Sequence, residues 1–137
     1  MKMINGIGLF CHEFSHTMGL PDFYPLTAEA QIDNQGMEYW DLMDGGEYTN
    51  NGYSPTPYTP WEKEVMGWTS LKTLKDSTIN VTLQPDDAWK IESDNSDEYL
   101  IVHNIQKKGW HTGIAKLGHG MLVYRINYGK NKVNMYD

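Results

Sequence analysis

The chain contains one cysteine, Cys11, among its 137 residues. A disulfide within the chain is therefore excluded, and we expect Cys11 to be a small buried residue on a helix. Long apolar runs are also lacking: none approaches the roughly 20 residues that a membrane-spanning helix requires. Basic residues are few, with eleven Lys and Arg against eighteen Asp and Glu, a net charge of −7. The composition therefore predicts a soluble protein whose partners are neither nucleic acid nor membrane.

The length allows one domain with a modest core, and no internal repeat divides it. Near the N-terminus, apolar residues recur at helical spacing and predict a helix from about residue 3 to Met18. The recurring residues are Ile4, Ile7, Phe10, Cys11, Phe14 and Met18. Gly19 follows at the position of a left-handed C-cap, and Pro21 prevents the helix from continuing. A sharp turn is therefore predicted at residues 19–21.

Residues 12–16 of this helix read HEFSH. His12 and His16 are four residues apart, so they lie on one helix face and both imidazoles can bind the same ion. Glu13 projects beside that ion, where its carboxylate can hold a water molecule. The turn after Gly19 can bring Asp22 back as a third ligand. Three ligands with an open fourth position are the arrangement of a catalytic zinc hydrolase.

Other residues offer weaker alternatives. A third ligand on a later helix would make Glu29 or Glu38 a candidate, but no helical pattern surrounds either residue. His103, His111 and His119 lie in predicted strands or loops, and we expect none of them to be a ligand. Oxygen ligands for calcium are present in the loops, although their spacing is not that of an EF-hand and solvated loops are favoured. Those loop residues are Asp33, Asn34, Asp41 and Asp44.

The rest of the chain predicts an α+β fold. The stretch YWDLMDGGEY predicts a tight buried turn, and Thr59-Pro60-Trp61-Glu62 is a capping box that begins a short helix ending near Met66, before Gly67. Alternating or dense apolar residues predict strands over residues 78–83, 99–102 and 121–126, with a smaller strand over 89–91. We expect these strands to form a small antiparallel sheet.

Several motifs together resemble the immune-inhibitor-A-type (M6) metallopeptidases, which are metzincin-like zinc endopeptidases. They are HEFSHTMGLPD, WDLMDGG, PWEKEVMGW, GHGMLVYRI and KVN. The resemblance implies that His12, His16 and Asp22 bind zinc, that Glu13 is the general base, and that Met43 lies in a Met-turn beneath the metal. Ser15 stands where such proteins often have glycine. Tyr39 and Tyr48 are candidates for stabilising an oxyanion or for packing around the Met-turn.

By this resemblance the chain is the C-terminal portion of a metzincin-like catalytic domain. Residues 1–68 would hold the zinc-site helix, loop, Met-turn and second helix, and residues 69–137 the β-rich distal part of the same domain. Relatives carry an upstream subdomain that grips extended substrate, whereas here the helix begins at the first residues. One flank of the core is therefore expected to be exposed and to favour self-association or pairing with such a subdomain.

The resemblance also implies a secreted protein with protein or peptide substrates, although the chain shows no signal peptide. Three hypotheses about function follow. The chain is a zinc endopeptidase that uses a zinc-activated water with Glu13 as general base, a noncatalytic zinc-binding remnant, or a binding module in which the HEFSH sequence is coincidental and no metal binds.

Overall fold

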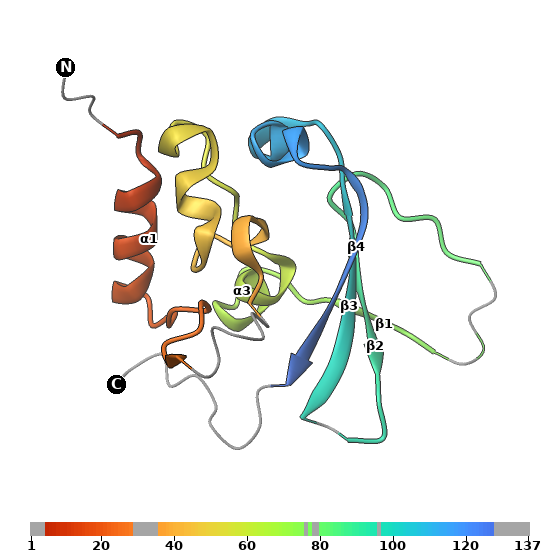
Figure 1. The fold of residues 1–137 in the computed structure, drawn as a ribbon. Helices are drawn as coiled ribbons and strands as arrows, with labels where there is room; N and C mark the ends of the chain where they lie inside the picture. Colours follow the sequence, from red (N-terminus) through yellow and green to blue (C-terminus); the bar gives the residue numbers. More distant parts are fainter. Residues whose placement is uncertain (1–4, 29–35, 76, 78–79, 96, 128–137) are drawn as a thin grey trace.

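A computed structural model describes residues 5–28, 36–75, 77, 80–95 and 97–127. It has two layers, with helices on one side and a four-stranded sheet on the other (Figure 1), which agrees with the predicted α+β class. The helices are α1 (Gly8–Thr17) and α3 (Pro60–Val65), with 3-10 turns η1 (Glu38–Trp40), η2 (Gly45–Gly52), η3 (Gly109–Thr112) and η4 (Ile114–Lys116). The strands are β1 (Lys72–Leu74), β2 (Ala88–Glu92), β3 (Glu98–Ile105) and β4 (Gly120–Asn127).

The sheet has the order β1-β2-β3-β4 and is mixed. The pairs β2–β3 and β3–β4 are antiparallel, as predicted. β1 pairs with β2 in parallel, so the prediction of an antiparallel sheet was wrong at this edge. β1 itself was not predicted. Of the strand predicted over residues 78–83, residues 78 and 79 lie outside the described residues, and residues 80–83 form no strand.

Helix α1 begins at Gly8, later than predicted, and residues 5–7 precede it without regular helix. Its apolar stripe faces solvent: Phe10 is 65% exposed and Phe14 is 51% exposed. The buried side is formed by Gly8, His12 and Ser15. A Cβ atom on Gly8 would lie 1.9 Å from the carbonyl oxygen of Glu47, so the glycine permits the helix to contact the backbone of η2. Cys11 is half-buried rather than buried.

The core lies between α3 and the sheet. Trp61, Ile101 and Tyr124 form its centre, and Phe23 packs edge-to-face on Trp61 with ring centroids 5.4 Å apart. The core therefore joins the helical first half of the chain to the β-rich second half. α3 begins with the predicted capping box, in which Thr59 and Glu62 bond reciprocally.

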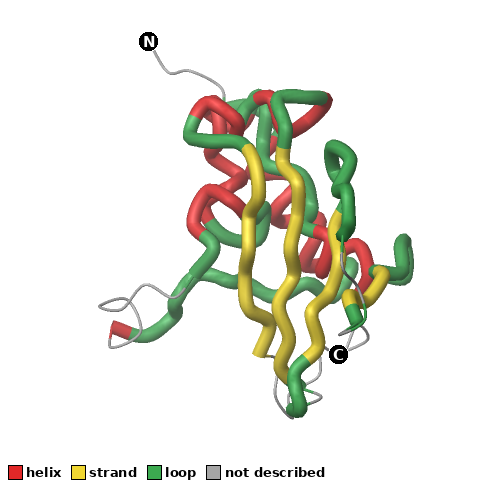
Figure 2. The backbone as a smooth tube through the Cα atoms, turned by 90° about the vertical axis from the view of Figure 1, so that its right-hand side faces the viewer, coloured by secondary structure: helices red, strands yellow, loops and turns green. Residues whose placement is uncertain are grey.

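Seen from the side of the sheet, the helices lie behind it (Figure 2), so they cover one of its two faces. Alternation along the strands puts Tyr124 on the covered face, whereas Met121 and Val123 are 71% and 47% exposed. Among the described helices, none has the length and apolar character needed to cross a membrane.

Candidate metal centre

The structure brings together the three residues that the sequence predicts as ligands. Asp22 Oδ1 lies 3.1 Å from His12 Nε2 and 3.3 Å from His16 Nε2. All three donor atoms lie within 4.8 Å of one another. In a tetrahedral zinc site with metal–ligand distances of about 2.0–2.1 Å, neighbouring ligand atoms are about 3.3–3.5 Å apart. The observed separations are therefore close to those that a bound zinc ion requires.

The bend after α1 positions Asp22. Gly19 adopts a positive φ of 89°, and its N–H donates to the His16 carbonyl oxygen. Leu20, which is 1% exposed, anchors the bend in the interior. On the other side of Asp22, the N–H of Phe23 donates to the Met43 carbonyl oxygen at 2.8 Å. Asp22 thus lies between two anchored residues, Leu20 and Phe23. The turn predicted at residues 19–21 brings it back toward the histidines.

Both imidazoles are oriented by backbone carbonyls. His12 Nδ1 lies 2.9 Å from the Leu42 carbonyl oxygen, and His16 Nδ1 lies 2.7 Å from that of Leu20. Because a carbonyl oxygen only accepts, each Nδ1 carries the proton, and each Nε2 presents a lone pair toward the Asp22 carboxylate. In this neutral tautomer, two imidazole nitrogens and one carboxylate oxygen converge on one point, at 3.1 and 3.3 Å. This donor set fits a divalent cation.

The buried carboxylate of Glu47, which the sequence reasoning missed, lies behind His12. Its Oε2 atom is 3.9 Å from His12 Nδ1, on the side away from Asp22, and this oxygen atom has no hydrogen-bond partner in the described part of the chain. Because the His12 Nδ1–H already donates to the Leu42 carbonyl oxygen, the Glu47 charge acts on the imidazole through space and not through a hydrogen bond. The only sequence signal was an acidic residue directly after the Gly45-Gly46 pair.

Glu13 is exposed on α1, next to His12. The pKa of Tyr24 is raised mainly by its hydrogen bond to Asp22, and the pKa of Tyr48 is raised mainly by its hydrogen bond to Glu47. The charge of Glu13 adds a smaller contribution to both shifts. The Glu13 and Asp22 carboxylates therefore both act on Tyr24. Tyr39 and Tyr48 are 47% and 57% exposed, so neither is enclosed by packing around the 41–44 turn.

The 41–44 turn reaches the site through its backbone. Met43 is fully buried, but the contacts that tie the turn to the site are made by the carbonyl groups of Leu42 and Met43. Asp41 accepts the Met43 N–H at 2.7 Å, and Asp44 accepts the Glu38 N–H at 2.6 Å. Asp41 and Asp44 are only 3% and 9% exposed, so the favoured interpretation of a solvated loop was wrong for these two residues. Neither residue belongs to a metal-ligating group in the described part of the chain, and Asp33 and Asn34 lie outside the described residues.

Ser15 is a further positioning residue of α1. Its Oγ donates to the Cys11 carbonyl oxygen at 2.6 Å and also lies 2.5 Å from the Tyr58 hydroxyl. The serine thus connects the buried side of the helix to the segment before α3. Of the alternative third ligands, Glu29 lies outside the described residues, and Glu38 joins no metal-ligating group in the described part of the chain.

The histidines that were predicted not to be ligands divide into two groups. His119 is exposed in the loop before β4, as expected. His103 and His111 are buried and converge on Asp86, which the sequence did not predict. Three separate segments supply this second group, so no local motif could have revealed it.

Comparison with known proteins supports a peptidase assignment. A family model described as Immune inhibitor A peptidase M6, catalytic domain, matches residues 2–70. The chain therefore belongs to the M6 family of immune inhibitor A metallopeptidases, as the sequence motifs predicted.

Among curated relatives, the pre-pro-metalloprotease PrtV of Vibrio cholerae serotype O1 (strain M66-2) is 32% identical over 63 residues, which cover 43% of this chain and 6% of PrtV. Immune inhibitor A of Bacillus thuringiensis subsp. alesti is 29% identical over 77 residues, 55% of this chain and 10% of that protein. The chain thus corresponds to a small part of these relatives. No solved structure matches it.

Proposed function

We propose that the chain carries the zinc-binding part of an endopeptidase active site, with His12, His16 and Asp22 as ligands and Glu13 as general base. The main support for this proposal is the position of Asp22 Oδ1, which lies 3.1 Å from His12 Nε2 and 3.3 Å from His16 Nε2. Membership of the M6 family supports the peptidase assignment. Residues 1–68 then supply the site, and residues 69–137 complete the same domain.

When bound at this site, zinc would supply a Lewis acid that lowers the pKa of water to about 7 and polarises a peptide carbonyl. The ligand residues hold their orientation because the Leu42 and Leu20 carbonyls fix the Nδ1 protons. His16 and Asp22 have side chains that are 34% and 24% exposed, so substrate and water reach the site from their side. His12 is enclosed on the opposite side.

Glu13 performs the proton transfers in this proposal. Its carboxylate accepts a proton from the attacking water and then passes that proton to the nitrogen of the leaving amine. Asp22 contributes a negative charge, so the metal would be a weaker Lewis acid than with three neutral histidines. Met43 would support the site from below, as a buried residue of the turn. In this proposal the protein acts outside the cytoplasm on protein or peptide substrates, which agrees with the description of the relative PrtV as a pre-pro-metalloprotease.

Substituting Glu13 tests this proposal. Glu13→Gln should lower kcat/KM on a quenched fluorescent peptide by about 10²–10⁴-fold, because general-base catalysis contributes an effect of that size. The zinc content, measured by mass spectrometry of the purified chain, should not change. Glu92→Gln on β2 is the matched control and should leave both values unchanged. Equal activity of Glu13→Gln and the unsubstituted chain would refute the role of Glu13, and zinc without any hydrolysis would identify a noncatalytic remnant.

A further inference from the structure

We propose that Asp86, His103 and His111 form a second binding site for a divalent transition metal of the zinc type. Asp86 Oδ1 lies 3.0 Å from His103 Nε2 and 3.8 Å from His111 Nε2. Together the three donor atoms lie within 4.8 Å of one another. They share no residue with the site on α1, so this proposal does not depend on the proposed peptidase activity.

Three segments that are distant in the sequence supply the donors. His103 lies on β3, where it pairs with Ala88 and Leu122, and His111 lies in η3. The two imidazoles pack edge-to-face with centroids 5.5 Å apart and are 2% and 7% exposed. Two histidines buried side by side beside one carboxylate are a ligand set suited to zinc, copper, nickel or cobalt.

The backbone holds Asp86 in an uncommon conformation. Its φ is +71°, in the left-handed region that few residues other than glycine adopt. Hydrogen bonds to β3 maintain this conformation: the Asp86 N–H donates to the Asn104 carbonyl oxygen at 2.8 Å, and the Asn104 N–H donates to the Asp87 carbonyl oxygen at 3.0 Å. The strand therefore fixes the residue that carries the carboxylate, next to the strand residue His103. Such strain is often retained where it positions a functional group.

Hydrogen bonding accounts for one of the two distances but not for the other. His103 is within hydrogen-bonding distance of Asp86 Oδ1, but 3.8 Å is too long for a hydrogen bond from His111. Around a tetrahedral zinc ion the ligand atoms would be about 3.3–3.5 Å apart, a value that lies between the two observed distances. Small movements of both imidazoles would bring all three atoms to bonding distance.

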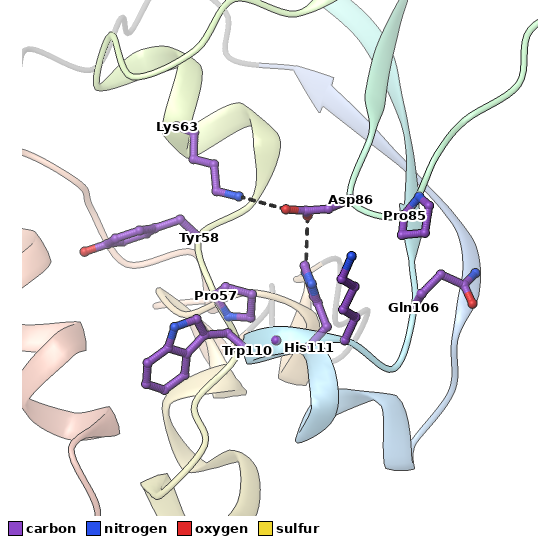
Figure 3. A pocket seen from close by; sticks show the side chains of 10 residues that line it. Pro57, Tyr58, Lys63, Pro85, Asp86, Gln106, Trp110 and His111 are labelled. Atoms are coloured by element: carbon purple, nitrogen blue, oxygen red, sulfur yellow. Dashed lines mark ion pairs between the residues drawn. The ribbon is translucent and has the colours of Figure 1, made fainter.

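The site is accessible from a cavity of about 500 Å³. Lys63 and His111 approach the Asp86 carboxylate from different directions in this cavity (Figure 3). Lys63 Nζ lies 3.8 Å from Oδ2, whereas both histidines face Oδ1, so the lysine and a metal would use different oxygens. The Asp86 side chain is 51% exposed, which leaves room for water to complete the coordination. The alternative is a metal-free cluster in which Asp86 bonds His103 and pairs with Lys63.

Metal titration in a chain that lacks the first site separates these alternatives. His16→Gln with Asp22→Asn removes two partly exposed ligands of the α1 site. Isothermal titration of this variant with Zn²⁺ should still give one equivalent, whereas the unsubstituted chain should bind two. X-ray absorption of the zinc-loaded variant should show scattering from two imidazole ligands. Failure of the peptidase proposal would give a different result: the unsubstituted chain would hydrolyse no peptide, or it would bind only the one zinc equivalent that the substituted chain also binds.

Substitutions at the second site complete the experiment. Asp86→Asn and His111→Gln, each added to that background, should weaken zinc binding on the order of 100-fold or abolish it. His119→Gln, which changes an exposed loop histidine, is the matched control and should have no effect. Circular dichroism of the metal-free variants checks that they fold. The proposal is overturned if the background variant binds no zinc, if its zinc lacks imidazole ligands, or if folded Asp86→Asn and His111→Gln variants bind zinc normally.

Discussion

His12 and His16 differ in exposure although they are one helical turn apart. His12 is 4% exposed and is bounded by the Leu42 carbonyl and Glu47, whereas the His16 side chain is 34% exposed. The pair therefore combines one rigidly enclosed imidazole with one at the open side of the site. This asymmetry follows from the packing of the His12 side of α1 on η2.

Glu47 should tune metal affinity through His12. Glu47→Gln removes the charge behind the imidazole but keeps the shape of the side chain, so zinc affinity at the α1 site should fall by about 10–100-fold. Competition with a chromophoric chelator measures this change, and an Asp86→Asn background removes any contribution from the second cluster. Asp94→Asn, an exposed charge in a loop, serves as the control. An unchanged affinity in Glu47→Gln would show that the carboxylate does not act on the metal site.

At the level of elements, α3 and the 41–44 turn meet through two buried carboxyl groups. Asp41 is 3% exposed and Glu62 is fully buried. Burial is the main cause that raises the pKa of Asp41 to about 7. Burial, followed by the charge of Asp41, raises the pKa of Glu62 well above its ordinary value. Because both folded-state pKa values exceed the unfolded ones, the folded chain binds more protons, and stability must fall as the pH rises.

The pH window follows from these shifts. Stability should be greatest below about pH 4 as far as this pair is concerned, and it should decline as the pH rises through about 7, where Asp41 ionises. Glu62→Gln should flatten this decline by up to about 1.4 kcal/mol per pH unit and should stabilise the chain at pH 8 more than at pH 5. Urea unfolding in the presence of a chelator, repeated across this pH range, measures the free energy of unfolding of both chains. Parallel curves for the two proteins would contradict a raised pKa at Glu62.

The elements also show which features local sequence can predict. The HEFSH spacing, the Gly19 cap, the Pro21 stop and the Thr59 capping box are contained in short segments, and the structure contains each of them. β1 has three residues and therefore no measurable period, so neither it nor its parallel pairing was predicted. Periodicity also could not predict which side of α1 is exposed. Close contact at Gly8 buries the side that carries His12, and the apolar side faces solvent.

At the scale of the whole molecule, long-range contacts bring together residues whose proximity could not be predicted from the sequence. Asp86, His103 and His111 come from a turn, a strand and a 3-10 turn, and only the folded sheet brings them together. Glu47 reaches His12 for the same reason, through the packing of η2 on α1. The α1 ligands were predictable because the helix and its adjoining bend alone bring them together.

Helix α1 lies at the outer edge of the helical layer, away from the sheet (Figure 1), and its apolar stripe is exposed. Ile7, Phe10 and Phe14 are the large apolar residues exposed there. The matched segments correspond to 6% of PrtV and 10% of immune inhibitor A, so most of each relative lies outside the segment that matches this chain. Self-association through this stripe, or pairing with an upstream subdomain, stays a prediction for this chain.

The central claim is that one zinc ion binds between α1 and the bend that follows it. An anomalous difference map at the zinc edge, from crystals of the zinc-saturated chain, tests this claim most directly. We predict a peak about 2.0–2.2 Å from His12 Nε2, His16 Nε2 and Asp22 Oδ1. A map without density between the two imidazoles, with the Asp22 carboxylate turned away from both, would contradict it.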